Sequence, residues 1–256
     1  MIRRRGPAFA VSVVPIVLAG CMPTGVTEQA RAVTTLWTQF LVAAAIVGGT
    51  VWVLISVMLV RYRRRSAEAD LIQAPAAPTD SRPVELAWTA IPIVIVLILF
   101  GLTLVALGTV DARSPSKVTI DVTAFRWQWR FDYEGTPVRV VGDPDTVARM
   151  VVPVGEPIHI VLTSADVDHA FYVPQFLFKR DAIPGHPNEF DVTITDPGTY
   201  NGQCAEFCGI YHDRMLLSVH AVSRPEYDAW LAAKAAQAAA AASAGPGAAP
   251  SGSRTP

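Results

Sequence analysis

Four residues near the C-terminal end of the sequence carry side chains that bind soft metal ions. Cys204, Cys208, His212 and Met215 are spaced four, four and three residues apart. Two thiolates, an imidazole and a thioether favour copper over magnesium or calcium. Zinc is a weaker interpretation, because zinc sites are completed by Cys and His and not by Met. A disulfide between the two cysteines is a further alternative for an exported protein, but it leaves His212 and Met215 unexplained.

A second cysteine in the same loop distinguishes this pattern from a single-copper electron carrier, which uses one Cys, two His and a weak axial Met. Two thiolates can bridge two coppers, and each copper then needs its own imidazole. A second histidine is therefore required. His169 is the best candidate on position alone, because it stands at a transition from loop to strand. We expect His159 and His220 inside strands and His186 in a turn.

Short segments of alternating polar and apolar residues surround these positions, and each is bounded by Pro, Gly, Asp or Asn. Such strands predict an antiparallel β-sandwich or barrel. The alternating segments are residues 117–123, 138–141, 157–162 and 189–194. A rigid β-framework of this kind would hold ligands from two loops at fixed distances.

A run of aromatic residues lies between the first two of these segments. Its members alternate with polar residues and are predicted to share one face of a single strand; they are Phe125, Trp127, Trp129, Phe131 and Tyr133. The simplest interpretation is a packed aromatic face. Further along the chain, Pro225 and Glu226 are typical of the first turn of a helix.

The composition of the chain excludes several classes of protein. Of the 256 residues, 51% are hydrophobic and 17% charged, with a net charge of −1. A freely soluble chain, a disordered chain and a nucleic-acid-binding protein are all disfavoured by these values. Residues 111–230, however, hold ten Lys/Arg and seventeen Asp/Glu, a net charge of −7. This part of the chain would steer a basic partner toward itself.

The apolar excess is concentrated in three stretches. Residues 1–20 place three arginines before an apolar run, as a secretory signal does. The sequence from Leu18 to Cys21 resembles the lipobox of bacterial lipoproteins, in which the cysteine is lipidated. Residues 36–60 and 86–110 contain no charged side chain, and each is long enough to span a bilayer.

The orientation of the two spans follows from the arginines that begin the segment between them, at positions 61 and 63–65. Such a cluster is retained on the cytoplasmic side, so both termini are expected outside. The predicted layout is a signal peptide (1–20), an external segment (21–35), a first span (36–60), a cytoplasmic loop (61–85), a second span (86–110), an exported metal domain (111–224), and a C-terminal helix with an Ala/Gly/Pro-rich tail (225–256).

The stretch from Cys204 to Met215 strongly resembles the binuclear copper A loop of the cytochrome c oxidase subunit 2 family. Residues 166–169 followed by residues 178–185 look like the family's first-histidine segment. The resemblance extends from the two-span hairpin to about Val222. It implies a transmembrane hairpin followed by an exported, all-β cupredoxin-like sandwich. It also implies two coppers, bound by the side chains of His169, Cys204, Cys208, His212 and Met215 and by the backbone carbonyl of Glu206.

Three further roles are implied by the same resemblance. The Glu206 carboxylate would bind a magnesium ion shared with subunit 1. Trp127 matches the tryptophan that first receives electrons from cytochrome c, although Gln128 stands where many relatives carry an aromatic residue. Glu85 matches the glutamate at the entrance of a proton pathway of subunit 1, and a carboxylate at that depth suits such a role.

The predicted protein is therefore a multi-pass subunit of a haem–copper terminal oxidase in a bacterial cell membrane, with its copper domain outside. By the resemblance, its partners are subunit 1 with its haem and copper B, subunit 3, and a cytochrome c or a cytochrome c domain as electron donor. A quinol oxidase subunit 2 would lack the copper ligands. A membrane-tethered copper carrier would favour a more exposed site, and a nitrous-oxide-type reductase domain would not carry the two spans and Glu85.

Overall fold

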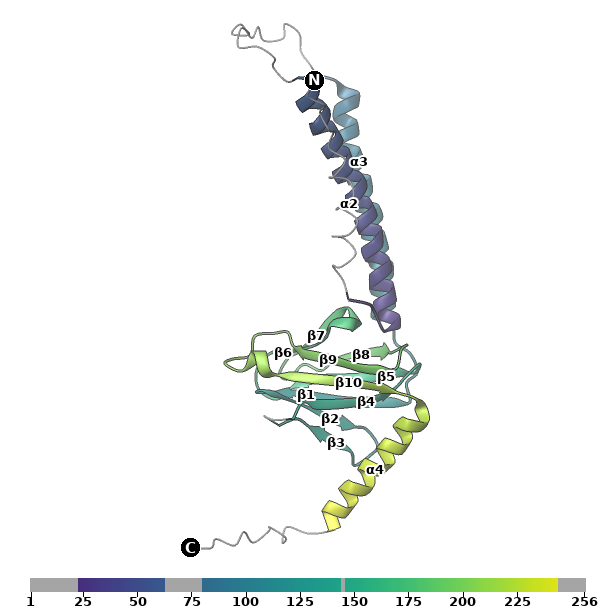
Figure 1. Cartoon of the computed structure of the whole chain (residues 1–256), viewed down its shortest axis with the longest axis vertical. Coiled ribbons are helices and arrows are strands. Elements are labelled where there is room, and N and C mark those ends of the chain that lie inside the picture. Colours follow the sequence, from purple (N-terminus) through teal and green to yellow (C-terminus); the bar gives the residue numbers. More distant parts are fainter. Residues whose placement is uncertain (1–22, 63–79, 144–145, 244–256) are drawn as a thin grey trace, which may run out of the picture. The chain divides into compact units, whose positions relative to one another are not determined.

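The computed structural model describes residues 23–62, 80–143 and 146–243 of the chain (Figure 1). Two compact units are present, one made of residues 32–110 and the other of the residues before and after them. The predicted signal peptide at 1–20, Cys21, most of the cytoplasmic loop and the end of the tail lie outside the described residues.

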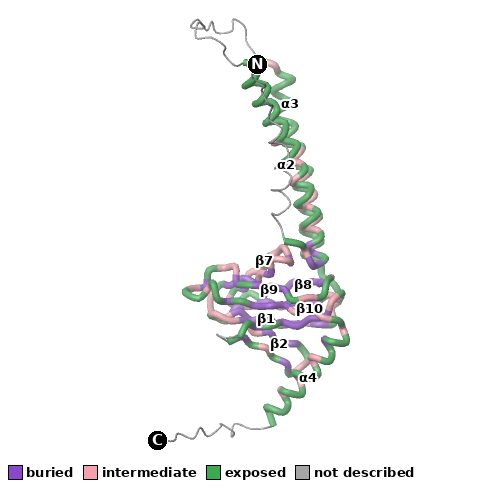
Figure 2. The backbone as a smooth tube through the Cα atoms, in the orientation of Figure 1, coloured by how far each residue is buried: buried purple, intermediate pink, exposed green. Residues whose placement is uncertain are grey.

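The first unit contains two long apolar helices, α2 (Glu28–Arg61), whose first turn belongs to the other unit, and α3 (Arg82–Val110). By length and composition, both could cross a membrane. Their apolar side chains are exposed along nearly the whole length, whereas buried residues gather in the β-strands (Figure 2). Threonine hydroxyls in these helices donate to the carbonyl four residues earlier, which satisfies them without water; they are Thr38, Thr50, Thr89, Thr103 and Thr109.

Helix α2 begins earlier than the span predicted at 36–60. Thr27 precedes the first turn, and its Oγ1 accepts a hydrogen bond from the backbone N–H of Ala30 at 2.9 Å. This is an N-cap, which starts the helix at Glu28. The first turn is therefore polar and precedes the apolar run.

The second unit is a sandwich of two five-stranded sheets. One sheet has the order β3-β2-β1-β5-β8 and the other β4-β10-β9-β6-β7. The strands are β1 (Val118–Phe125), β2 (Gln128–Tyr133), β3 (Arg139–Val141), β4 (Ala148–Pro153), β5 (Pro157–Ser164), β6 (His169–Val173), β7 (Phe178–Ala182), β8 (Asn188–Thr193), β9 (Gly198–Cys204) and β10 (Leu216–Val222). Two short 3-10 helices, η1 (Pro174–Phe176) and η2 (His212–Arg214), interrupt the connections.

The sandwich predicted from the sequence is confirmed, but its pairing is not purely antiparallel. β1 pairs in parallel with β5, and β4 pairs in parallel with β10. Each parallel pair joins strands that are far apart in the chain, because the connections between them cross from one sheet to the other. Alternation within a strand predicts which faces are buried and carries no information on the direction of the neighbouring strand.

The core lies between the two sheets and explains the alternating pattern. Along β5 every second residue is buried, and the largest buried side chains include Trp129, Phe131, Phe171 and Phe176. The ring of Trp129 meets that of Phe171 edge to face at 5.9 Å between centroids, which joins β2 of one sheet to β6 of the other. This packing fixes the spacing of the sheets from which the metal-binding residues come.

The predicted aromatic strand is divided by a turn, and this corrects the expectation that its five aromatic residues share one face. β1 ends at Phe125 and β2 begins at Gln128, and these two residues pair across a tight hairpin. Trp129, Phe131 and Tyr133 face the core as predicted. Trp127 belongs to the turn, where it is only half-buried, because no strand alternation holds it on the inner face.

The segment before α2 and the first turn of that helix belong to the β unit. Thr27 bridges Ile194, the residue that follows edge strand β8, and the backbone N–H of Thr195 donates to the Val26 carbonyl at 2.8 Å. The Gln29 amide donates to the Asp191 carbonyl and accepts from the Thr193 N–H. This segment therefore provides hydrogen-bond partners for some of the backbone groups along the edge of β8.

At the other end of the chain, α4 (Arg224–Ser243) begins one residue before the predicted start at Pro225. Its first turns contact the sandwich, since Trp230 meets Tyr133 edge to face at 5.1 Å between ring centroids. Tyr227 is buried beside it. Leu231 and Ala235 also pack, partly buried, against the core, whereas most of the alanine-rich remainder of the helix is exposed.

Candidate metal centre

The cysteine loop is held closed by the two strands on either side of it. β9 ends at Cys204 and β10 begins at Leu216, and the strands pair as an antiparallel hairpin. The Cys204 N–H donates to the Met215 carbonyl at 2.9 Å, which closes the neck of the loop. The donor side chains, which are unevenly spaced along the sequence, are thereby brought into one small volume.

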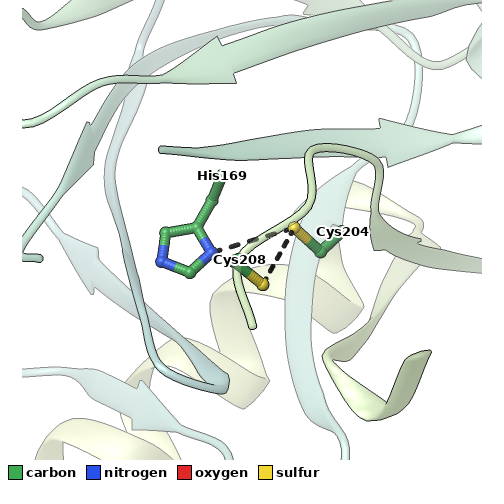
Figure 3. Close-up of side chains that lie close together, drawn as sticks. All are labelled: His169, Cys204 and Cys208. Carbon is green, nitrogen blue, oxygen red and sulfur yellow. Dashed lines mark hydrogen bonds between the residues drawn. The ribbon is translucent and has the colours of Figure 1, made fainter. Parts of the chain in front are cut away.

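The histidine predicted from a distant strand lies against this loop. His169 is the first residue of β6, and β6 pairs with β9 so that Phe171 stands opposite Cys204. The imidazole Nδ1 is 3.8 Å from the Cys204 Sγ, and the two sulfur atoms are 3.9 Å apart (Figure 3). The ligand atoms of His169, Cys204 and Cys208 all lie within 4.8 Å of one another, and all three residues are buried.

The remaining predicted ligands complete the cluster around Cys208. His212 Nδ1 lies 3.5 Å from the Cys208 Sγ, and Met215 Sδ lies 3.8 Å from it. The backbone carbonyl of Glu206 lies 3.2 Å from the Cys204 Sγ. Each sulfur thus has one imidazole and one weaker donor beside it. A set of soft donors this close together fits copper, and the residues present suit a metal pair.

The disulfide interpretation fails on geometry. Cys204 and Cys208 are free thiols, and their separation of 3.9 Å is about twice the length of an S–S bond.

The orientation of His169 is fixed by a carboxylate behind it. Its Nε2 lies 2.9 Å from Asp166 Oδ1, which directs Nδ1 toward the sulfur atoms. Asp166 is itself held by the backbone N–H groups of Arg126 and Val167. Burial raises the pKa of Asp166, but the hydrogen bonds from His169 and these groups outweigh it and lower the pKa to about 2. Asp166 stays ionised and keeps the ring in place.

The two thiols differ in acidity. Burial raises the pKa of Cys204, but its hydrogen bond with His169 and its contacts with the backbone outweigh that effect and lower the pKa below the ordinary value. The pKa of Cys208 is raised, first by burial and then by the charge of Cys204. Once one thiolate has formed, the second proton is retained until a cation compensates the charge.

Trp127 contacts the loop from outside the cluster. Its indole Nε1–H donates to the Cys208 carbonyl at 3.2 Å. Gly209 makes this contact possible, because its φ of +121° is unfavourable for other residues and a Cβ there would lie 3.3 Å from the indole ring. The ring of Tyr211 meets the Trp127 ring edge to face at 5.0 Å. The tryptophan therefore touches the backbone of a predicted ligand residue.

The other predicted residues lie apart from the cluster or outside the described chain. The Glu206 side chain points to Lys179, whose Nζ lies 3.0 Å from its carboxylate. Glu85 lies in the first turn of α3, in the other compact unit, and is exposed. Cys21 is outside the described residues. His159 and His220 lie in strands β5 and β10, as expected, and His186 follows a turn.

Two neighbours of the cluster have no role in the sequence-based prediction, namely Asp166 and Tyr211. Asp166 stands three residues before His169, and a carboxylate near a metal-binding histidine is a usual device for orienting its ring. That spacing could have indicated it. Nothing in the sequence indicates that Tyr211 contacts Trp127, because the turn and the loop that bring them together are 84 positions apart.

Comparison with known proteins agrees with this geometry. The family model described as "Cytochrome C oxidase subunit II, periplasmic domain" matches residues 143–222, and the corresponding transmembrane-domain model matches residues 15–107. The cytochrome c oxidase subunit 2 of Corynebacterium glutamicum is 31% identical, over 80% of this chain and 73% of its own length. A Nocardia farcinica protein named "Probable cytochrome c oxidase subunit 2" is also 31% identical, over 90% of this chain and 81% of its own. This chain belongs to the cytochrome c oxidase subunit 2 family.

Among solved structures, the periplasmic domain of subunit II of the Bradyrhizobium japonicum cytochrome oxidase is 31% identical. It covers 48% of this chain and 97% of its own length, with a TM-score of 0.46. Membership of the subunit 2 family confirms the predicted identity, the two membrane helices followed by a β-sandwich, and the place of this chain in an oxidoreductase complex. It also accounts for the His/Cys cluster as the metal centre of a copper-binding subunit.

Proposed function

We propose that this subunit receives electrons, one at a time, from a c-type cytochrome and passes them to the haem of subunit 1, where oxygen is reduced to water with proton translocation. The observation that carries this proposal is the buried cluster of His169, Cys204 and Cys208, with Trp127 hydrogen-bonded to its outer side. Buried soft donors hold a metal tightly. An aromatic ring between that metal and the surface gives electrons a short path through bonded and packed atoms.

The side chains that would hold the metal are His169, Cys204, Cys208, His212 and Met215, together with the Glu206 carbonyl. When bound, a pair of coppers supplies one-electron chemistry, accepting one electron as the donor haem iron goes from Fe(II) to Fe(III). The chain contributes a rigid frame. His169 is fixed by Asp166, and the loop neck is closed by the Cys204–Met215 hydrogen bond, so the donors need to move little.

Trp127 is proposed as the first relay for electrons. Trp127→Phe removes the indole N–H that donates to Cys208 and leaves every donor side chain in place. Reduction by the cytochrome should slow by about tenfold, which corresponds to about 1.4 kcal/mol in activation free energy. Stopped-flow reduction kinetics with copper content as the control would measure this. Unchanged kinetics at full copper content would exclude Trp127 as the relay.

The Glu206 carboxylate is proposed to bind a magnesium ion shared with subunit 1. Its contact with Lys179 would give way to the divalent ion when the subunits assemble. Glu206→Gln in the assembled oxidase should weaken binding of Mn²⁺, used in place of Mg²⁺, while the backbone carbonyl and the copper content are unchanged. Unaltered Mn²⁺ affinity by electron paramagnetic resonance would refute this assignment.

Glu85 is proposed to lie at the entrance of a proton pathway of subunit 1, on the cytoplasmic side. Glu85→Gln should slow steady-state turnover and proton uptake but leave the reduction of the copper centre by cytochrome c unchanged. Arg82→Gln, in the same first turn of α3, provides a control for general effects at this end of the helix. Normal proton uptake in the Glu85 variant would remove it from the pathway.

We further propose that residues 1–20 are a signal peptide, that Cys21 carries a lipid, and that both termini lie outside a bacterial membrane. Subunits 1 and 3 would be its partners within the membrane. Mass spectrometry of the mature N-terminus should show a chain that begins at a diacylated Cys21. A chain that begins at Met1, or an unmodified cysteine, would contradict the proposal.

A further inference from the structure

A groove beside Trp127 has an unexpected charge. Its volume is about 610 Å³, and its lining includes Trp127, Tyr211, Arg126, Arg214 and Asp143. Two of these three charged residues are arginines, whereas residues 111–230 as a whole have a net charge of −7. The surface around the proposed electron relay is thus more positive than the domain that carries it.

Arg214 is stacked on the aromatic pair that leads to the cluster. Its guanidinium lies 5.6 Å from the centroid of the Tyr211 ring, in a cation–π arrangement. The Tyr211 ring in turn meets Trp127 edge to face at 5.0 Å, and Trp127 donates to the Cys208 carbonyl. Arg214, Tyr211 and Trp127 therefore form a continuous series from solvent to the metal-binding loop.

Arg214 differs from most cations of the domain, because it forms no salt bridge with a carboxylate of the described residues. Of the ten Lys/Arg in residues 111–230, seven form salt bridges with described carboxylates, including Arg126 in the same groove, which pairs with Asp166 at 3.2 Å. Within the described ranges, Lys117, Arg149 and Arg214 form none. Arg214 is the one of these three that lines the groove. Its charge is available to a docking protein.

Exposed apolar side chains of the loop that carries Arg214 would strengthen such a contact. Phe207 and Ile210, in the same loop, are 79% and 77% exposed, and Tyr211 is 46% exposed. A partner that covers this loop, together with the Tyr211 ring under Arg214, excludes water from around the guanidinium. A carboxylate can form two hydrogen bonds with the guanidinium. Without water around it, this ion pair is stronger than at an open surface.

We infer that the donor cytochrome places a carboxylate on Arg214, over the Tyr211 ring, when its haem edge approaches Trp127. This inference rests on the proposed function, since it names the donor's contact chemistry at the same site. The two charge effects act at different ranges. The domain's net negative charge attracts a basic partner from a distance, and Arg214 selects, at contact, a donor with an acidic residue beside the haem edge.

The test uses the assembled oxidase and one soluble c-type cytochrome in two versions, which carry either glutamate or lysine at a single surface position beside the exposed haem edge. Second-order rate constants for reduction of the copper centre are measured by stopped flow at low ionic strength. Arg214→Glu should slow reduction by the glutamate version of the cytochrome by about tenfold. Reduction by the lysine version should be as fast as in the unsubstituted oxidase or faster. Arg214→Lys should retain part of the rate with the glutamate version.

Lys117→Glu provides the matched control, because it makes the same change of charge at an exposed, unpaired cation. Lys117 precedes β1, about 26 Å along that strand from Phe125, at 3.3 Å per residue. Lys117→Glu should change the rates at which the two cytochrome versions reduce the copper centre by equal, small factors. Equal effects of Arg214→Glu on both versions, or none on the glutamate version, would overturn the inference. Failure of the proposed function would appear differently, as no reduction of the wild-type copper centre by either version.

Discussion

The loop between β9 and β10 contrasts two sets of side chains only a few residues apart. The inner set consists of the predicted metal donors Cys204, Cys208 and Met215, which are buried. The outer set consists of Phe207 and Ile210, which are more than three-quarters exposed. Hydrophobic burial alone would place the phenylalanine and isoleucine inside. Burial of apolar surface therefore does not explain the conformation of this loop, and its apolar side chains form an exposed surface.

Of the changes that would break this contrast, removal of a donor from the inner set is expected to have the largest effect. Cys204→Ser removes the thiol that contacts His169, Cys208 and the Glu206 carbonyl. Copper content should fall from two to one or none per chain, with loss of the copper absorption bands. Phe207→Ser, in the outer set of the same loop, should keep both coppers. Equal copper loss in the two variants would show that the sets are not separate.

Gly209 lies between the two sets, and its replacement should affect both. Gly209→Ala forces a side chain into a backbone conformation with φ of +121° and places a Cβ against the Trp127 indole. The cost should be about 1–2 kcal/mol in the free energy of unfolding. Denaturant unfolding of the copper-loaded protein would measure this cost, and donor kinetics should slow because the indole is displaced. Gly155→Ala, also at positive φ but with nothing within 4 Å of its Cβ, separates backbone strain from displacement of Trp127.

A smaller effect is expected from the outer set alone. Phe207→Ser combined with Ile210→Ser should weaken the binding of cytochrome c by about tenfold, because each exposed apolar contact is worth about 1 kcal/mol or less at an interface. Copper content and the free energy of unfolding should not change, since both side chains are exposed. Isothermal calorimetry and chemical unfolding test both statements. A loss of folding stability would mean that these residues support the loop.

The smallest effect distinguishes the two cysteines within the inner set. In metal-free protein, the pKa of Cys204 lies below that of an ordinary thiol and the pKa of Cys208 above it. As pH rises, Cys204 should therefore become a thiolate first and react with iodoacetamide, while Cys208 should react only at higher pH. Peptide mapping after labelling at a series of pH values would show the order. Identical pH profiles of labelling would contradict the difference in pKa between the two thiols.

The sequence predicts the inner set well, because its chemistry is local. Three donor spacings within twelve residues indicate a soft-metal site, and alternating segments indicate the sandwich that holds it. His169 is also identifiable by its position at the start of a strand. What the sequence does not provide are the contacts between distant segments. The turn that places Trp127 outside the core, its contact with Tyr211 and the parallel pairing of β1 with β5 all depend on tertiary packing.

The attachment of the N-terminal segment to the β unit is a second feature that local patterns do not predict. Residues 26–30 are few and have no strand-like alternation, yet Thr27 and Gln29 bond to the edge of β8 more than 160 residues away. A side chain that bonds to the backbone at a sheet edge, in place of a neighbouring strand, leaves no periodic pattern in the sequence. The domain predicted to begin at residue 111 therefore includes a piece of chain that precedes the first span.

The central claim is that the inner set, together with His169, His212 and the Glu206 carbonyl, holds two coppers as one electron-accepting centre. The most direct measurement is the copper content and electron paramagnetic resonance spectrum of the full chain, purified in detergent and loaded with copper. The account predicts two coppers per chain and a mixed-valence signal in which one unpaired electron is shared between both nuclei. One copper per chain, or a signal confined to a single nucleus, would contradict it.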